Sequence, residues 1–127
     1  MNQKHVADLV VALLAVNSYP ATLAWALLPR LRAAHLLDPA EVARKEAVDL
    51  VDGLRRAGYD RGGITDIVGP RLHALMVRIR AGGLDALDAA VAADDKSAAR
   101  DLLLDVPGVG PRVFETAWLL LTSDTAE

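Results

Sequence analysis

Apolar residues recur at helical spacing along most of the chain, and the polar residues between them mark the places where helices end. Residues 5–16 show the pattern most clearly, because their apolar positions form one continuous stripe. The stripe consists of Val6, Leu9, Val10, Leu13 and Leu14. This pattern predicts a buried first helix that ends at the polar break of residues 17–20.

The second apolar segment predicts a helix that runs towards Leu37. Ser18 is a suitable cap for this helix, with Pro20 in its first turn. We expect a kink at Pro29, because the proline ring removes an internal hydrogen bond.

A capping pattern opens the third segment. Asp38 and Glu41 have the spacing of a capping box, with Pro39 at the first helical position. A helix or a closely spaced helix pair then continues to Arg56, with inward positions at Val48, Val51 and Leu54. Gly58 is suited to end it, and residues 59–63 form a loop.

The next helix is predicted over residues 71–81, after an irregular start at Gly69 and Pro70. Its apolar face is formed by Leu72, Leu75, Met76 and Ile79, and Gly82 and Gly83 stop it. A short helix over residues 84–93 follows. The chain therefore reads as seven or eight short helices with no strand.

The last segment, over about residues 98–122, predicts two helices joined by a tight turn. Ser97 is expected to cap the first helix, and Pro111 suits the first position of the second. In the turn, Gly108 and Gly110 can adopt positive φ and leave room for another backbone to approach.

This turn also predicts an anion site. The amides of Gly108, Val109 and Gly110 can point outward together beside the positive end of the second helix, and Arg112 adds a cation there. A phosphate oxygen suits such a site. The alternative is a simple corner in which the glycines serve only the geometry of the turn.

Composition limits the other possibilities. The chain has 127 residues, which is enough for one domain with one core. Hydrophobic residues make up 53% of it, but aromatic and β-branched residues are few, and this composition favours an all-α fold. The absence of cysteine excludes disulfides, thiol catalysis and a cysteine-bound iron–sulfur cluster. No apolar run reaches the roughly eighteen residues that a membrane-spanning helix needs. Residues 6–16 are not followed by the small-residue cleavage site of a signal peptide. We therefore expect a cytoplasmic protein without membrane contact.

The excess of acidic over basic residues argues against a DNA-binding protein with a basic surface all round. The net charge is −3, whereas DNA-binding domains usually carry a basic surplus. The cations are mostly arginine, which is the better phosphate ligand. DNA binding would therefore need a local basic face.

The pattern of hydrophobe, Pro107, Gly108, Val109, Gly110 and then Arg112 resembles the helix-hairpin-helix signature. In order and length, the other elements resemble the helical-barrel half of the helix-hairpin-helix DNA glycosylases of the endonuclease III type. The resemblance implies non-specific contact with the DNA backbone through the turn. It also implies a base pocket or DNA face near Ser18, Tyr19, Tyr59 and Arg61.

The chain departs from that family where the chemistry takes place. Bifunctional members carry a nucleophilic Lys at the position of Arg112, and a guanidinium cannot replace it. At family spacing the catalytic Asp would lie beyond Glu127, and Asp124 is too close to the hairpin helix to replace it. We therefore expect no catalytic residue of its own in this chain.

No other group of residues suggests an active site. His5, His35 and His73 have no metal-ligand spacing, so we expect no metal and no cofactor. Two carboxylate pairs one turn apart, at residues 49 and 52 and at residues 85 and 88, fit solvated helix faces.

The sequence thus favours a non-catalytic DNA-binding protein, with a role in DNA repair suggested by the resemblance. Two alternatives remain: a DNA glycosylase with an unrecognised or partner-supplied carboxylate, and a protein-interaction module. Apolar surface expected near Trp118, Leu119 and Leu120 would suit a second copy of the chain or another protein.

Overall fold

The computed structural model describes residues 1–123, which form nine helices and no strand. The all-α prediction is confirmed, whereas Asp124 lies outside the described residues. The helices are α1 (Gln3–Leu14), α2 (Ala21–Ala26), α3 (Leu28–Ala33), α4 (Pro39–Ala43), α5 (Ala47–Arg56), α6 (Gly63–Arg80), α7 (Leu87–Ala92), α8 (Lys96–Leu104) and α9 (Pro111–Leu121).

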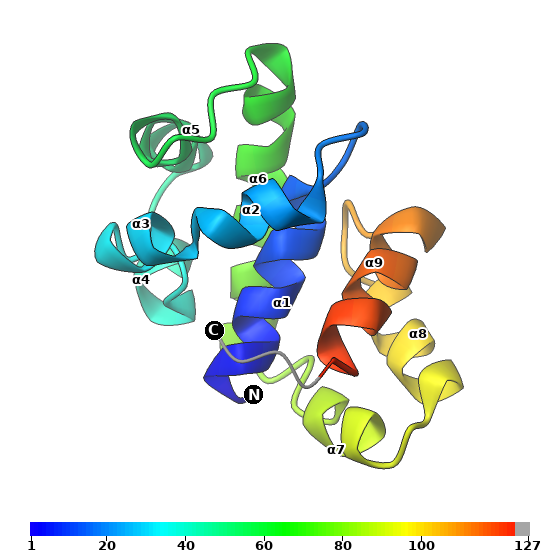
Figure 1. Cartoon of the computed structure of the whole chain (residues 1–127). Helices are drawn as coiled ribbons and strands as arrows, with labels where there is room; N and C mark the ends of the chain where they lie inside the picture. The colour runs from blue at the N-terminus through cyan, green and yellow to red at the C-terminus, as the bar shows by residue number, and fades with distance from the viewer. Residues whose placement is uncertain (124–127) are drawn as a thin grey trace.

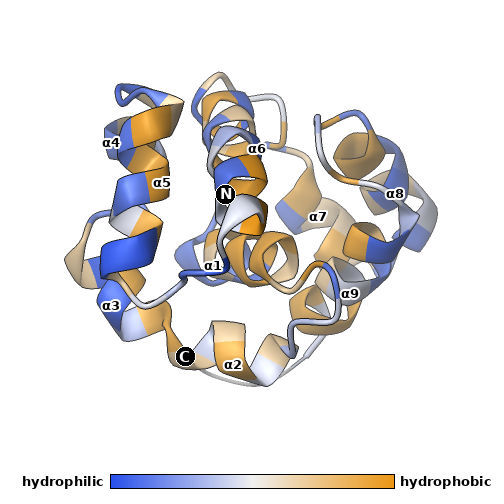
Figure 2. Ribbon diagram, turned by 90° about the horizontal axis from the view of Figure 1, so that it is seen from above, coloured by the Kyte–Doolittle hydropathy of each residue, from blue (hydrophilic) through white to orange (hydrophobic). Residues whose placement is uncertain are grey.

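Helix α1 lies at the centre of the molecule. Every residue from His5 to Leu14 is buried, as expected for a helix that other helices surround. Helices α3, α4 and α5 lie on one side of α1 and α6, and helices α7, α8 and α9 lie on the other (Figures 1 and 2). The hairpin therefore belongs to a different half of the molecule from α3–α5.

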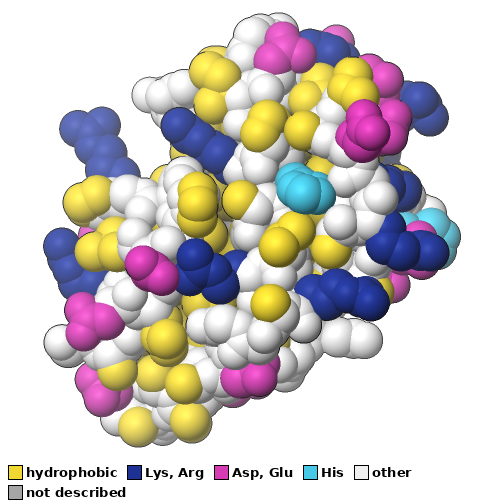
Figure 3. All heavy atoms as spheres, turned by 180° about the vertical axis from the view of Figure 1, so that it is seen from behind, with side chains coloured by type: hydrophobic (Ala, Val, Ile, Leu, Met, Phe, Trp, Pro, Cys, Tyr) yellow, Lys and Arg dark blue, Asp and Glu magenta, His cyan; other side chains and the backbone are white. Residues whose placement is uncertain are grey.

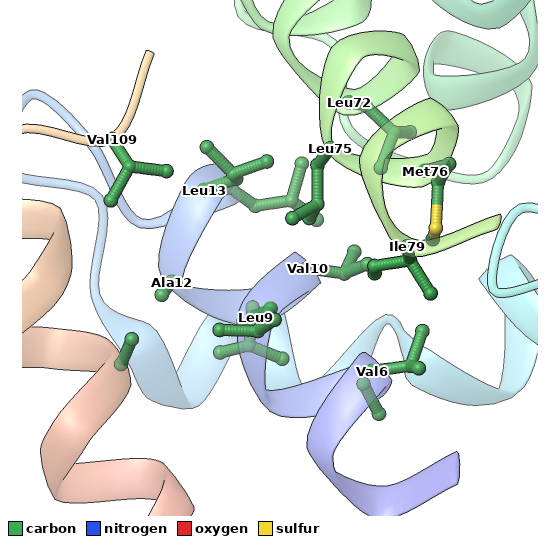
Figure 4. Close-up of a cluster of buried hydrophobic side chains, with 14 of the residues drawn as sticks. Val6, Leu9, Val10, Ala12, Leu13, Leu72, Leu75, Met76, Ile79 and Val109 are labelled. Carbon is green, nitrogen blue, oxygen red and sulfur yellow. The ribbon is translucent and has the colours of Figure 1, made fainter. Parts of the chain in front are cut away.

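The core joins α1 to α6. Val10 and Leu13 of α1 point towards the apolar face of α6, and Val109 from the hairpin turn lies beside Leu13 (Figure 4). That face consists of Leu72, Leu75, Met76 and Ile79, all buried as the periodicity predicts. The hairpin turn is thus anchored in the same core as the central helices.

The prediction of an irregular start at Gly69 and Pro70 is wrong, because α6 continues through both residues. A Cβ at Gly69 would lie 2.4 Å from a methyl carbon of Val51, so this glycine serves the close packing of α5 on α6. That packing outweighs the one backbone hydrogen bond that Pro70 removes.

The predicted kinked helix after residue 20 is instead two short helices. Pro29 lies in the first turn of α3, where its missing N–H matters least. Ser18 does not cap α2, since Pro20 occupies the cap position and no side chain bonds there. Ser18 itself is exposed, with φ of +66°.

Two other predicted details are wrong. Val48 is 62% exposed, because it lies on the same face of α5 as the exposed Asp49 and Asp52. The cap of α8 is Asp95, whose carboxylate accepts the amide of Ala98 at 3.1 Å, rather than Ser97.

Several of the predicted helix starts and ends are confirmed. Asp38 caps α4, and Gly58 and Gly82 follow α5 and α6 with positive φ. The helix predicted over residues 84–93 is present only from Leu87 to Ala92. Within residues 1–123, no helix combines the length and apolar character that a membrane span needs.

Candidate nucleic-acid interface

The predicted hairpin is present between α8 and α9. The turn begins after Leu104 and ends at Pro111, and two backbone bonds of 3.1 Å hold it, from Val106 to Leu103 and from Val109 to Val106. The Val109 amide is therefore used inside the turn, and the prediction that it faces a ligand is wrong. The amides of Gly108 and Gly110 make no hydrogen bond within the described residues.

The two glycines of the turn serve different purposes. Gly108 has φ of +87°, which favours glycine, and a Cβ there would lie 2.6 Å from Cγ and Cδ of Arg71. Gly110 has φ of −95°, and a Cβ there would meet nothing within 4 Å. The backbone at Gly110 is consequently open to an approaching ligand.

Two hollows meet at the hairpin. The first, here called the turn hollow, has a volume of about 680 Å³ and is lined by Arg71 and residues 108–113. The second, the loop hollow, has a volume of about 440 Å³ and lies between α9 and the loop after α1. It is lined by Ala12, residues 15–18, Arg71, Arg112, Val113 and Thr116.

Arg71 and Arg112 line both hollows. The side chains of these two arginines make no ion pair or hydrogen bond within residues 1–123. No described Asp or Glu lines either hollow, although the whole chain has 17 acidic residues against 14 Lys and Arg. Seen from behind, a notch between the halves of the molecule has a Lys or Arg side chain on each side (Figure 3).

Nearby acidic residues pair with other cations. Asp105, at the end of α8, accepts a bond of 2.7 Å from Arg78 of α6. Glu115 of α9 pairs with Lys96 at 3.0 Å. The first pair links the hairpin to α6 and the second links its two helices to each other, and neither involves Arg71 or Arg112.

Of the residues predicted to line a base pocket or DNA face, the structure brings only Ser18 to the hairpin. Ser18 and its neighbour Asn17 line the loop hollow together with Arg112. Both have positive φ, +66° and +55° respectively. Asn17 belongs, like Ser18, to the polar break that was predicted to follow the first helix.

The other three members of that predicted pocket form a separate internal cluster. Tyr59 is fully buried and donates its hydroxyl to the Leu14 carbonyl at 2.6 Å. Arg61 donates to the carbonyls of Val16 and Asn17 at 2.6 and 3.0 Å, and its guanidinium lies 4.8 Å from the ring centre of Tyr19. Tyr59 thus offers no exposed ring on which a base could stack.

Arg71 is a residue of the candidate site that the sequence alone does not predict. It lies inside the regular pattern of α6, far along the chain from the hairpin, and nothing near it in the sequence marks it as special. Only the fold places its aliphatic stem against Gly108.

The remaining titratable groups do not form a metal site. The part of the chain that the structure describes contains no group of three His, Cys, Asp or Glu suited to bind a metal ion. His5 pairs with Asp88 at 2.6 Å, so Asp88 is not simply part of a solvated face. Asp8 is buried beside Lys4, and burial raises the pKa of its carboxyl group above the ordinary value.

The apolar surface expected at the end of α9 is smaller than predicted. Trp118 is buried and stacks on Phe114, with 6.3 Å between the ring centres. Leu119 is 72% exposed, whereas Leu120 is partly buried. A protein partner near this end of the molecule stays a prediction, and Trp118 itself is only 8% exposed.

No protein-family model, curated protein or solved structure matches this chain.

Proposed function

We propose that this protein binds the phosphate backbone of DNA at the hairpin between α8 and α9, and that it has no catalytic activity of its own. The observation that carries the proposal is the pair of hollows lined by Arg71 and Arg112 without an acidic neighbour. An acidic protein whose described residues leave two arginines unpaired beside an open turn offers a local site for an anion.

The groups around the turn hollow suit a phosphate rather than a base. Guanidinium groups bind phosphate oxygens through paired N–H donors. The open backbone at Gly110 lies next to the N-terminus of α9, an eleven-residue helix whose dipole favours negative charge. Contacts of this kind fix the position of a protein on DNA without reading sequence.

The lining of the hollows supports binding without chemistry. Its described residues include no carboxylate, imidazole or amine, which are the common general acids and bases. The resemblance of residues 107–112 to the helix-hairpin-helix signature supports DNA as the source of the phosphate. This resemblance and the local charge favour DNA binding over a protein-interaction module.

The proposal can be tested by titrating a labelled DNA duplex with the protein at low and at physiological salt. We expect an affinity in the micromolar range, typical of non-specific contacts, and weaker binding as salt increases. Arg112→Ala should weaken binding equally for all sequences and reduce the salt slope by about one unit. Gly110→Val should weaken it by placing branches where the phosphate approaches.

Arg44→Ala is the matched control, since it removes one cation from the other half of the molecule, where Arg44 pairs with Glu41 at the end of α4. This variant should bind like the wild type. Absence of binding by the folded wild type at low salt, or equal binding by all variants, would overturn the proposal.

A further inference from the structure

The two hollows share their most strongly charged part. Arg71, Arg112 and Val113 line both, so the turn hollow and the loop hollow adjoin along these three residues, here called the shared wall. The shared wall therefore carries two guanidinium groups, each with one positive charge. No other titratable side chain among the described residues lines either hollow.

Arg71 is held in this position by packing. Its Cβ, Cγ and Cδ lie where a side chain on residue 108 would begin, at 3.1, 2.6 and 2.6 Å from an ideal Cβ on Gly108. The residue is also only partly exposed. Its stem is therefore fixed against the turn, which reduces the side-chain entropy lost when a ligand binds.

The two positive charges of the shared wall are more than the single negative charge of a phosphate inside a strand can neutralise. A phosphodiester within a strand carries one negative charge, whereas a phosphomonoester carries about 1.5 to 2 negative charges near neutral pH and presents three strong acceptor oxygens. Asn17, Ser18 and Thr116 add neutral polar groups to the loop hollow. These features match a terminal phosphate better than a phosphate inside a strand.

From this match, and on the basis of the proposed function, we propose that the shared wall binds the terminal phosphomonoester of a nucleic-acid strand. The protein would then favour DNA ends or nicks that carry a phosphate over uninterrupted backbone. A 5′-phosphate and a 3′-phosphate offer the same chemistry, and the experiment separates them.

The test compares labelled duplexes of one sequence whose ends carry a single 5′-phosphate, a single 3′-phosphate or only hydroxyl groups. We expect at least one phosphorylated end to bind about tenfold more tightly than the hydroxyl end, as for one added charge-assisted contact. The preference should shrink at pH 5, below the second phosphate pKa of about 6, because the phosphate then loses charge.

Arg71→Met tests the wall itself, since it keeps most of the packed stem and removes the charge. This variant should bind the hydroxyl-ended duplex more weakly than the wild type does, because one cation of the site is gone, and it should also lose most of the preference for a phosphorylated end. Arg44→Ala should retain the preference.

The outcomes separate the two proposals. Equal binding of all three duplexes, together with weaker binding by Arg112→Ala, would overturn the end preference and leave backbone binding in place. No binding of any duplex by the folded protein would overturn both. An end preference that Arg71→Met leaves unchanged would overturn the assignment to the shared wall.

Discussion

Arg61 and the pair of Arg71 and Arg112 lie beside the loop formed by residues 16–19, and they differ in their hydrogen bonding. Arg61 donates to two carbonyls of this loop and to the Tyr59 hydroxyl, and its guanidinium lies over the ring of Tyr19. Arg71 and Arg112 line the loop hollow and have no partner among the described residues. Arg61 therefore serves the fold, whereas Arg71 and Arg112 belong to the proposed phosphate site.

The difference arises because the carbonyl groups at the end of α1 need hydrogen-bond donors. The last carbonyls of a helix have no partner inside it, and a buried helix cannot leave them to water. Tyr59 supplies a donor to Leu14, and Arg61 supplies donors to the residues after it. An arginine close to a helix C-terminus is therefore as much a candidate for capping as for binding nucleic acid.

The largest effect that we predict comes from removing Arg61. Arg61→Met should lower the free energy of unfolding by about 2 kcal/mol, since hydrogen bonds from a charged donor to carbonyls are worth about 1.5–3 kcal/mol and partial exposure reduces this value. Arg61→Lys should recover part of the loss. Urea denaturation measures both variants.

Arg71→Met is the matched substitution at the proposed phosphate site, and it should change the free energy of unfolding by less than about 0.5 kcal/mol. Similar losses for Arg61→Met and Arg71→Met would mean that the distinction between structural and available arginines is wrong.

A smaller difference in the free energy of unfolding is expected between alanine substitutions at the two glycines of the turn. Gly108→Ala places a Cβ in the left-handed region and against the stem of Arg71, so it should cost about 1–2 kcal/mol. Gly110→Ala meets no neighbour and should cost less, because its only penalty is a poorer helix cap. Thermal denaturation of the pair tests this, and an equal loss of stability in both would contradict the assignment.

The hairpin could be predicted from the sequence because its signals are local. A glycine with positive φ and a proline at the first helical position act within a few residues of the turn. The features that were missed depend on contacts between distant segments. Gly69 continues α6 because Val51 packs against it, and Arg71 joins the site because α6 passes behind the turn.

The base-pocket prediction shows the same limit. Ser18, Tyr19, Tyr59 and Arg61 are polar or aromatic residues in or beside loops, and the sequence does not show which of them face inward. The structure leaves Ser18 exposed and buries Tyr59 completely. The carbonyls at and after the end of α1, which have no partner inside the helix, decide this outcome because they accept from Tyr59 and Arg61, and no residue type in the sequence marks them.

The smallest predicted effect concerns the pair of Lys4 and Asp8, in which Lys4 is another cation that serves the fold. Its ammonium group donates to Asp8 at 2.7 Å and to the Leu120 carbonyl at 3.0 Å, and so joins α1 to the last turn of α9. The Asp8 side chain is fully buried, and its second oxygen has no partner within the described residues. Burial therefore raises the pKa of Asp8 above its ordinary value, against the smaller opposing effects of Lys4 and His5.

The raised pKa of Asp8 fixes the sign of its contribution to stability. Between the unfolded pKa, near 4, and the higher folded pKa, the folded state binds more protons than the unfolded state, so this residue makes the free energy of unfolding fall as pH rises. Asp8→Asn cannot titrate and should lack this fall, while Lys4 keeps its bond to Leu120. Urea denaturation at several pH values from 4 to 7 should show the wild type losing stability relative to Asp8→Asn as pH increases. Asp101→Asn, which changes an exposed carboxylate on α8, should instead run parallel to the wild type. Parallel profiles for the wild type and Asp8→Asn would show that burial of Asp8 does not shift its titration.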